Sequence, residues 1–220
     1  MADWQTALET VAAAYARGTL EKDARTISEA YRLKTGEGRR LLTRKSEAAA
    51  YALSRMPATV EAAKAALDQL GLDRLLIIPD REPPHKDLAA EAATPQQRLD
   101  MAALMADGLG PRAEASDLEL RREGKSYTAD TVEELHEQFP EDELWLLMGT
   151  DMFLTLHLWH EPEVILSLAG ICAFGRTEQD GEAMFAPQRE YLQKNFDAKI
   201  TTITLPGLVD ISSTRLREQL

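Results

Sequence analysis

Short apolar segments that alternate with helical segments, from residue 74 onward, constrain the fold of this chain more than any other feature. Mostly apolar, partly β-branched runs predict buried strands at residues 74–78, 143–148 and 170–174. Residues 113–118 and 199–205 are weaker strand candidates. Because strands that alternate with helices form parallel sheets covered on both faces, the sequence predicts an α/β fold with a Rossmann-like parallel sheet.

Helix signals occupy the intervals between these strands. Thr94, Pro95 and Gln97 have the spacing of an N-cap, a first-turn proline and a capping-box glutamine. Residues 128–131 lead into a second helix that extends to about residue 139. Further helices are predicted at residues 161–168 and 187–195, the latter starting at its proline.

The first third of the chain has a different character. It predicts helices at residues 4–17, 20–34, 46–55 and 58–70, the last closed by Gly71, and it contains no strand candidate. Residues 1–62 have a net charge of +2, whereas the remaining residues have a net charge of −14. We therefore expect two parts, a helical segment at 1–62 and an α/β domain at 63–220.

Composition excludes several classes of protein. The net charge of −12 argues against nucleic-acid binding, which needs a basic surface. The sequence has no apolar run near the ~20 residues of a membrane helix and no secretion signal at its start. The lone cysteine, Cys172, forms neither an internal disulfide nor a thiolate metal cluster. These features favour a cytoplasmic protein that does not bind membranes, and they leave its oligomeric state open.

Ligand sites of open parallel sheets lie beyond the carboxyl ends of the strands, so the loops there are candidates. The first such loop spans residues 79–86 and is stiffened by three prolines. His85 and Lys86 at its end could neutralise a phosphate, or the loop could simply carry charge for solubility.

Two more segments hold polar groups that suit a nucleotide. Residues 124–131 open a helix with hydroxyl side chains, which fits either an anion site or ordinary N-capping. Gly149 permits close backbone approach and Asp151 could accept from a ribose hydroxyl, although this pairing is common in turns.

Aromatic and imidazole side chains follow at residues 153–160. Trp159 could stack on a planar base or serve as a core aromatic, and the sequence leaves both open. His157 and His160 are predicted to be structural, since no third metal ligand is evident near them.

The most specific local signal lies at residues 210–217. Ser212, Ser213 and Thr214 precede a helical turn, and Arg217 lies one turn after Ser213. Backbone N–H groups, hydroxyls and a guanidinium at one helix start would bind phosphate, whereas a plain serine N-cap is the alternative.

Taken together, residues 64–220 resemble bacterial nicotinate-nucleotide adenylyltransferase. The matching pieces, in order, are Pro83-Pro-His-Lys86, Arg98-Leu-Asp-Met101, Asp117-Leu-Glu119, Arg122-Glu-Gly-Lys-Ser-Tyr-Thr-Ala-Asp-Thr131, Gly149-Thr-Asp151, Trp159, Phe174-Gly-Arg176 and Ile211-Ser-Ser-Thr-Arg-Leu-Arg217. The last piece is shared with other adenylyl- and cytidylyltransferases. The Ser-Tyr-Thr-x-Asp-Thr piece, together with Trp159, points to the pyridine-nucleotide branch.

The resemblance implies adenylyl transfer from ATP to nicotinate mononucleotide, with Mg²⁺ on the phosphates, in NAD biosynthesis. It assigns Thr128 and Trp159 to the nicotinate part and Gly149 and Asp151 to the adenosine ribose. It assigns the phosphates of ATP to Ser212, Ser213, Thr214 and Arg217, the phosphate of the mononucleotide to Lys86 and His85, and a further substrate contact to Arg176.

One expected motif is absent from the sequence. The family begins with a strand followed by Gly-Gly-Thr-Phe-x-Pro-x-His-x-Gly-His, and no such pattern occurs here, where His85 is the first histidine. We therefore expect a gap in the sheet where that strand belongs. The alternative function is a nucleotide-binding remnant or chimera without catalysis, since residues 1–62 weakly resemble the leader of the small-subunit ribosomal methyltransferase-like family.

Overall fold

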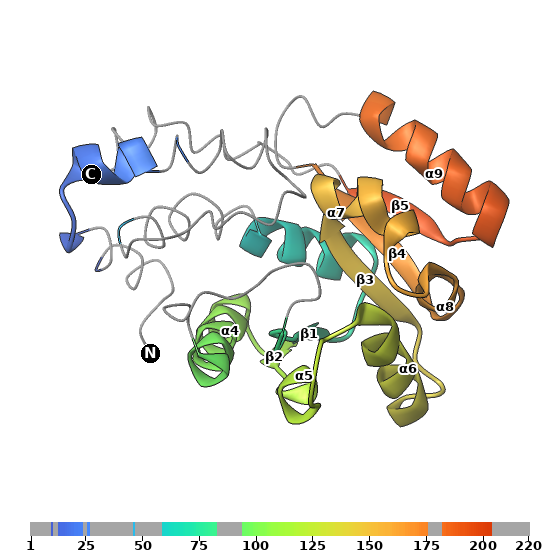
Figure 1. The fold of residues 1–220 in the computed structure, drawn as a ribbon, viewed down its shortest axis with the longest axis horizontal. Helices are drawn as coiled ribbons and strands as arrows, with labels where there is room; N and C mark the ends of the chain where they lie inside the picture. The colour runs from blue at the N-terminus through green and yellow to red at the C-terminus, as the bar shows by residue number, and fades with distance from the viewer. Residues whose placement is uncertain are drawn as a thin grey trace.

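The computed structural model describes residues 10, 13–23, 26, 46, 59–82, 94–175 and 182–203 (Figure 1). A helix of residues 59–69 precedes the labelled elements. These are β1 (Leu75–Ile77), α4 (Pro95–Leu109), β2 (Ala113–Ala115), α5 (Leu118–Arg121), α6 (Thr128–Gln138), β3 (Leu144–Gly149), α7 (Thr150–Thr155), the 3₁₀ turn η1 (Leu156–Leu158), α8 (Pro162–Leu168), β4 (Ala169–Phe174), α9 (Glu182–Phe196) and β5 (Ile200–Ile203). The predicted alternation of strand and helix is confirmed.

The described strands form two separate parallel sheets. β1 pairs with β2, while β3, β4 and β5 pair in that order. No described residue before β1 forms a strand, and no described strand bridges β1 and β3. Among the described strands, the sheet is therefore interrupted between the β1–β2 pair and β3.

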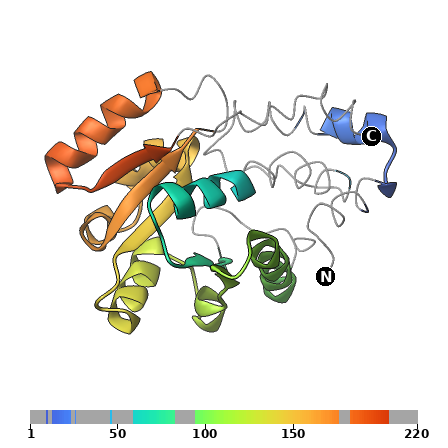
Figure 2. The ribbon, with the colours of Figure 1, turned by 180° about the vertical axis from the view of Figure 1, so that it is seen from behind.

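Helices cover both faces of the three-stranded sheet, as seen from opposite sides in Figures 1 and 2. On one face, Ile171 packs with the helices α7, α8 and α9 through residues such as Phe153 and Leu192. On the other face, Cys172 and Phe174 pack against Ala62 and Ala66 of the helix at 59–69. Every residue of β4 is buried because both faces are covered.

Helix ends follow their sequence signals. Gly71 has φ +62°, and the N–H of Leu72 donates to the carbonyl of Leu67 at 3.0 Å, which is the closing bond of a Schellman motif. At the start of α4, Thr94 and Gln97 form the predicted capping box, with Pro95 in the first turn.

Three predictions about element boundaries or burial were wrong. β1 is half-buried rather than buried, because β2 is its sole partner among the described strands. The strand expected at 113–118 ends at Ala115, and Leu118 already belongs to α5. α9 begins at Glu182 and contains Pro187, because a proline within the first helical turns disrupts few backbone hydrogen bonds.

No helix in the described residues is both long and apolar enough to span a membrane.

Candidate active site

The carboxyl ends of β3, β4 and β5 lie at one edge of their sheet. Gly149 pairs with Phe174, and Phe174 pairs with Ile203, so the three strands end in register. The Thr150 hydroxyl donates to the Phe174 carbonyl at 3.4 Å, which ties the loop after β3 to the end of β4. Loops that leave this edge therefore start close together, as a ligand site of a parallel sheet requires.

Two of the residues assigned to ATP lie at this edge. Gly149 is buried, ends β3 and is the N-cap of α7 with φ −79°. This backbone conformation is open to any residue, so the φ angle at position 149 does not require glycine. Asp151 is exposed in the first turn of α7, directly after the strand end. Its carboxylate is thus accessible to a ligand at the sheet edge.

Thr128 is half-buried at the start of α6. The N-cap of this helix is Tyr127, which has no capping side chain, so the hydroxyls at this helix start do not form an ordinary N-cap. Instead, the neighbouring hydroxyls of Ser126 and Thr131 bond to Glu119. The N-capping alternative considered for residues 124–131 is therefore wrong.

Trp159 follows η1 and is half-buried against the apolar core around Phe153. Its indole N–H donates to the Thr155 hydroxyl at 3.4 Å. The next residue, His160, stacks on Tyr127 with the ring centroids 4.2 Å apart and the planes tilted by 38°. This contact joins the segment of Thr128 to the segment of Trp159, although these two residues are 31 positions apart in the chain.

His157 has partners that fit its structural interpretation. Its Nδ1 lies 2.9 Å from the amide nitrogen of Gln188, and its ring meets Tyr191 edge-on at 5.4 Å. Within the described ranges, no group of three His, Cys, Asp or Glu side chains is arranged to hold a metal ion.

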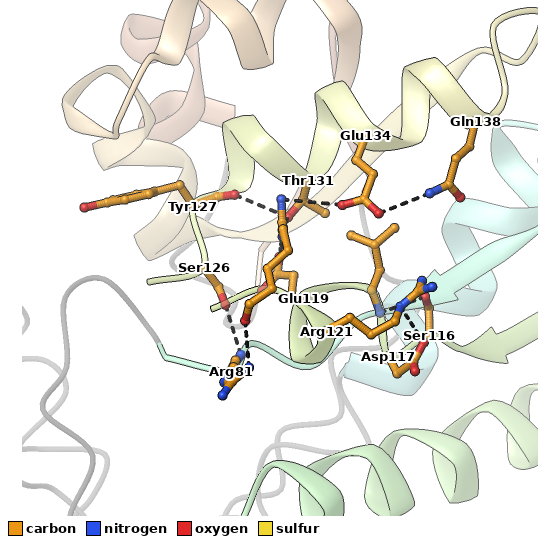
Figure 3. Close-up of polar contacts among 12 residues, drawn as sticks. Arg81, Ser116, Asp117, Glu119, Arg121, Ser126, Tyr127, Thr131, Glu134 and Gln138 are labelled. Carbon is orange, nitrogen blue, oxygen red and sulfur yellow. Dashed lines mark hydrogen bonds and ion pairs between the residues drawn. The ribbon is translucent and has the colours of Figure 1, made fainter. Parts of the chain in front are cut away.

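A buried polar network lies beside Thr128 (Figure 3). Glu119, 8% exposed on α5, accepts from the Thr131 hydroxyl at 2.7 Å and from the Ser126 hydroxyl. Arg122 Nη2 lies 3.9 Å from the Glu119 carboxylate and also donates to the Thr131 oxygen. Burial raises the pKa of the Glu119 carboxyl, while these hydrogen bonds and the Arg122 charge lower it in part.

Two arginines connect this network to the loop after β1. The backbone N–H of Arg81 donates to Ser126 Oγ at 3.0 Å, and its guanidinium donates to the Leu120 and Arg122 carbonyls. Arg98 of α4 donates to the carbonyls of Asp80 and Arg81 at 2.6 and 2.8 Å. The first residues of the loop that leads toward His85 and Lys86 are therefore fixed by charged donors.

The other predicted site residues lie outside the described part of the chain. They are His85, Lys86, Arg176, Ser212, Ser213, Thr214 and Arg217. Their assigned roles remain predictions.

Sequence reasoning missed the roles of Glu119 and Arg81. Glu119 was noted as part of Asp117-Leu-Glu119 but received no function. The available signal was one acidic residue between two leucines, Leu118 and Leu120, in a short segment. Such a residue is usually a solvated side chain, and only the fold shows that it is buried.

A parallel sheet with helices on both faces and polar loops at its carboxyl edge defines the class: an α/β protein built to hold a nucleotide-like ligand at that edge. A family model described as "Cytidylyltransferase-like" matches residues 58–219. The chain belongs to this cytidylyltransferase-like family.

Curated relatives agree with the resemblance seen in the sequence. A protein of Lachnoclostridium phytofermentans is 34% identical over 157 residues, which covers 71% of this chain and 76% of that protein. One from Dictyoglomus thermophilum is 35% identical over 157 residues, with the same shares. Both are named probable nicotinate-nucleotide adenylyltransferase.

Solved structures agree with the fold. The nicotinic acid mononucleotide adenylyltransferase of Plasmodium falciparum complexed with NaAD superposes with a TM-score of 0.54 at 17% identity, covering 74% of this chain and 76% of that one. The same enzyme complexed with APC gives a TM-score of 0.51 at 16% identity, covering 74% and 75%. This level of identity establishes the shared architecture.

Proposed function

We propose that this chain transfers the adenylyl group of ATP to nicotinate mononucleotide, giving deamido-NAD and pyrophosphate. The observation that carries the proposal is the stacking of Tyr127 on His160. It joins two segments distant in sequence, those of Thr128 and Trp159, which the resemblance assigns to the same nicotinate ring. The curated relatives, which match over 71% of the chain, support the same reaction.

The chemistry is a single in-line displacement. An oxygen of the 5′-phosphate of nicotinate mononucleotide forms a bond to the α-phosphorus of ATP, and the bond to the β-phosphate bridging oxygen breaks, releasing pyrophosphate. No covalent enzyme intermediate is needed, so the protein contributes alignment and charge stabilisation. Most of the rate enhancement is therefore expected from groups that position the two substrates.

The proposed roles divide the site into a part that binds ATP and a part that binds nicotinate mononucleotide. Gly149 and Asp151 hold the adenosine ribose, and Thr128 and Trp159 hold the nicotinate. The remaining contacts come from residues outside the described ranges. Ser212, Ser213, Thr214 and Arg217 bind the ATP phosphates, Lys86 with His85 faces the mononucleotide phosphate, and Arg176 contacts the substrate.

Mg²⁺ is proposed to enter with ATP. It neutralises charge on the phosphates and on the leaving pyrophosphate. Mg²⁺ usually takes few protein ligands beside substrate phosphates and water.

We further propose that the chain divides near residue 62 into a helical segment and the nucleotidyltransferase domain at 63–220. The family match supports this division, because it begins at residue 58.

The direct test is pyrophosphate release by the purified 220-residue chain with ATP, Mg²⁺ and nicotinate mononucleotide. Nicotinamide mononucleotide in place of the acid is the control, and lower release is expected with it. An Arg217→Ala variant should weaken ATP binding measured by calorimetry. Absence of release from a folded chain that still binds ATP would overturn the proposal in favour of a binding remnant.

A further inference from the structure

Glu119 contacts the segment of residues 126–131 on both sides of Thr128. Its carboxylate accepts from Ser126, two residues before Thr128, and from Thr131, three residues after it. Figure 3 shows Ser126 in the loop before α6, where its dashed contact runs to Arg81, and Thr131 in the first turn of that helix. The backbone of Tyr127 and Thr128 lies between the two anchor points and is thereby held at both ends.

The hydrogen bonds of the network have a single consistent direction. Ser126 Oγ accepts from the Arg81 N–H at 3.0 Å, so its own proton is available to Glu119. Thr131 Oγ1 accepts from Arg122, and this oxygen lies 2.7 Å from Glu119 Oε1, against 3.3 Å from the Tyr127 carbonyl oxygen, so its proton is best directed to Glu119. An ionised carboxylate accepts from both hydroxyls at once, whereas an amide offers one oxygen and presents N–H donors to the second hydroxyl.

The network is also linked to the segment that contains Trp159 and His160. Tyr127, held between the anchors, carries the ring that stacks on His160, which follows Trp159. A shift of Tyr127 would therefore move one wall of the nicotinate site relative to the other. Of the residues assigned to ATP, the structure describes Gly149 and Asp151, and neither of these two bonds to Glu119.

We propose that Glu119 is a positioning residue that fixes the Tyr127–Thr128 segment for the pyridine nucleotide and leaves ATP binding unaffected. This inference rests on the proposed function for its choice of substrate. Glu119 touches no reacting atom; it acts through Ser126 and Thr131.

The matched experiment compares Glu119→Gln with Glu134→Gln. Glu134 lies on α6, pairs with the same Arg122 at 3.8 Å and accepts from Gln138 at 3.2 Å, so the control makes the same chemical change on the same arginine. We expect Glu119→Gln to raise KM for nicotinate mononucleotide about tenfold, as loss of one charged hydrogen bond does, with KM for ATP changed less than about twofold. Glu134→Gln should leave both values unchanged.

Thr131→Val provides a second test in case the Glu119→Gln variant fails to fold. It removes one of the two anchors and keeps the carboxylate, so KM for nicotinate mononucleotide should rise in the same direction by about threefold to fivefold. If both substituted chains fold and change the two KM values in equal proportion, or change neither, the positioning role is overturned.

Hydrogen exchange separates this inference from the proposed function. The Ser126 amide donates to the Glu82 carbonyl at 2.9 Å, and Glu119→Gln should accelerate exchange at residues 126–128 about tenfold relative to α9. Faster exchange in a chain without turnover would sink the proposed function and keep the positioning role. Turnover with unchanged exchange and unchanged KM would support the proposed function and overturn the positioning role of Glu119.

Discussion

The two sheets of this chain are stabilised by different means. The three-stranded sheet is enclosed on both faces by apolar side chains, and every residue of β4 is buried. The two-stranded sheet is half-buried or exposed throughout. The loop that leaves β1 is instead fixed by polar contacts of Arg81 and Arg98 and, through Ser126, of Glu119.

The two regions therefore have different roles: apolar packing supports the sheet, and polar contacts position the loops of the site. Apolar burial is non-directional and stabilises the sheet that presents Gly149 and Asp151. Hydrogen bonds are directional, and they set the angle and register of the loop segments near Thr128. We therefore expect substitutions in the first region to change stability most, and substitutions in the second to change ligand binding more than folding.

The largest expected effect concerns the reactivity of Cys172, which probes the enclosed sheet. Burial raises the pKa of its thiol to about 12, so the native chain at pH 8 should react with iodoacetamide about a thousand times more slowly than a free thiol. The measurement is alkylation followed by mass spectrometry. The control is Ser167→Cys at an exposed position of α8 in a Cys172→Ala background, which should react at once. Rapid native labelling of Cys172 would show that this sheet is open.

The next effect is a cavity in the core. Phe153 is fully buried and meets Phe185 edge-on at 5.6 Å, so Phe153→Ala should lower the free energy of unfolding by about 3–5 kcal/mol. Phe139→Ala provides the comparison near β1, where the ring is half-buried beneath Arg74. Its cost in urea denaturation should be less than half as large. Equal costs would contradict the division between the two regions.

A smaller effect is expected from overpacking. A Cβ at Gly170 would lie 2.7 Å from the ring of Trp145, its partner in the strand register, so Gly170→Ala should cost about 1–3 kcal/mol. Gly18 lies in a helix at residues 17–23, although the sequence placed it between the helices predicted at 4–17 and 20–34, and it has no atom within 4 Å of the added carbon. Gly18→Ala should therefore stabilise this helix by about 0.5–1 kcal/mol. Thermal unfolding of the two variants should show opposite signs.

The smallest effect is the pH dependence contributed by Glu119. Its pKa is raised in the folded state, so this group favours folding most at low pH, and that contribution is lost as pH rises through the folded pKa. The unfolding free energy of the native sequence minus that of Glu119→Gln should therefore decline from about pH 4 upward, by roughly 1.4 kcal/mol per unit of pKa difference. Thr131→Val should steepen the decline, because the Thr131 hydrogen bond lowers this pKa. A difference that grows with pH would contradict the raised pKa.

Much of the fold could be predicted from local signals. The capping box at Thr94 and the helix end at Gly71 depend on residues within a few positions of one another. β4 was found because a strand buried on both faces needs an uninterrupted apolar run, and β3 was found from a similar run although its first four residues are half-buried. β2 and the start of α9 were misjudged because short segments with mixed composition contain little periodic signal.

The candidate site was predictable in part. Gly149 and Asp151 follow a strongly apolar strand, so their place at the sheet edge could be foreseen. The contact between Tyr127 and His160 could not, because it depends on the packing of α6 against α8. The partners of Glu119 likewise come from segments up to 12 residues away in the chain.

The sequence by itself determined the alternation of strands and helices, the start of α4 at Thr94, the helix end at Gly71 and the resemblance to the nucleotidyltransferase family, since each depends on residues close together in the chain. The tertiary structure alone decided that the described strands form two sheets and that Glu119 is buried between Ser126 and Thr131. The physical reason is that burial and hydrogen-bond partners depend on which distant segments meet. A carboxylate looks the same in the sequence whether water or two hydroxyls surround it.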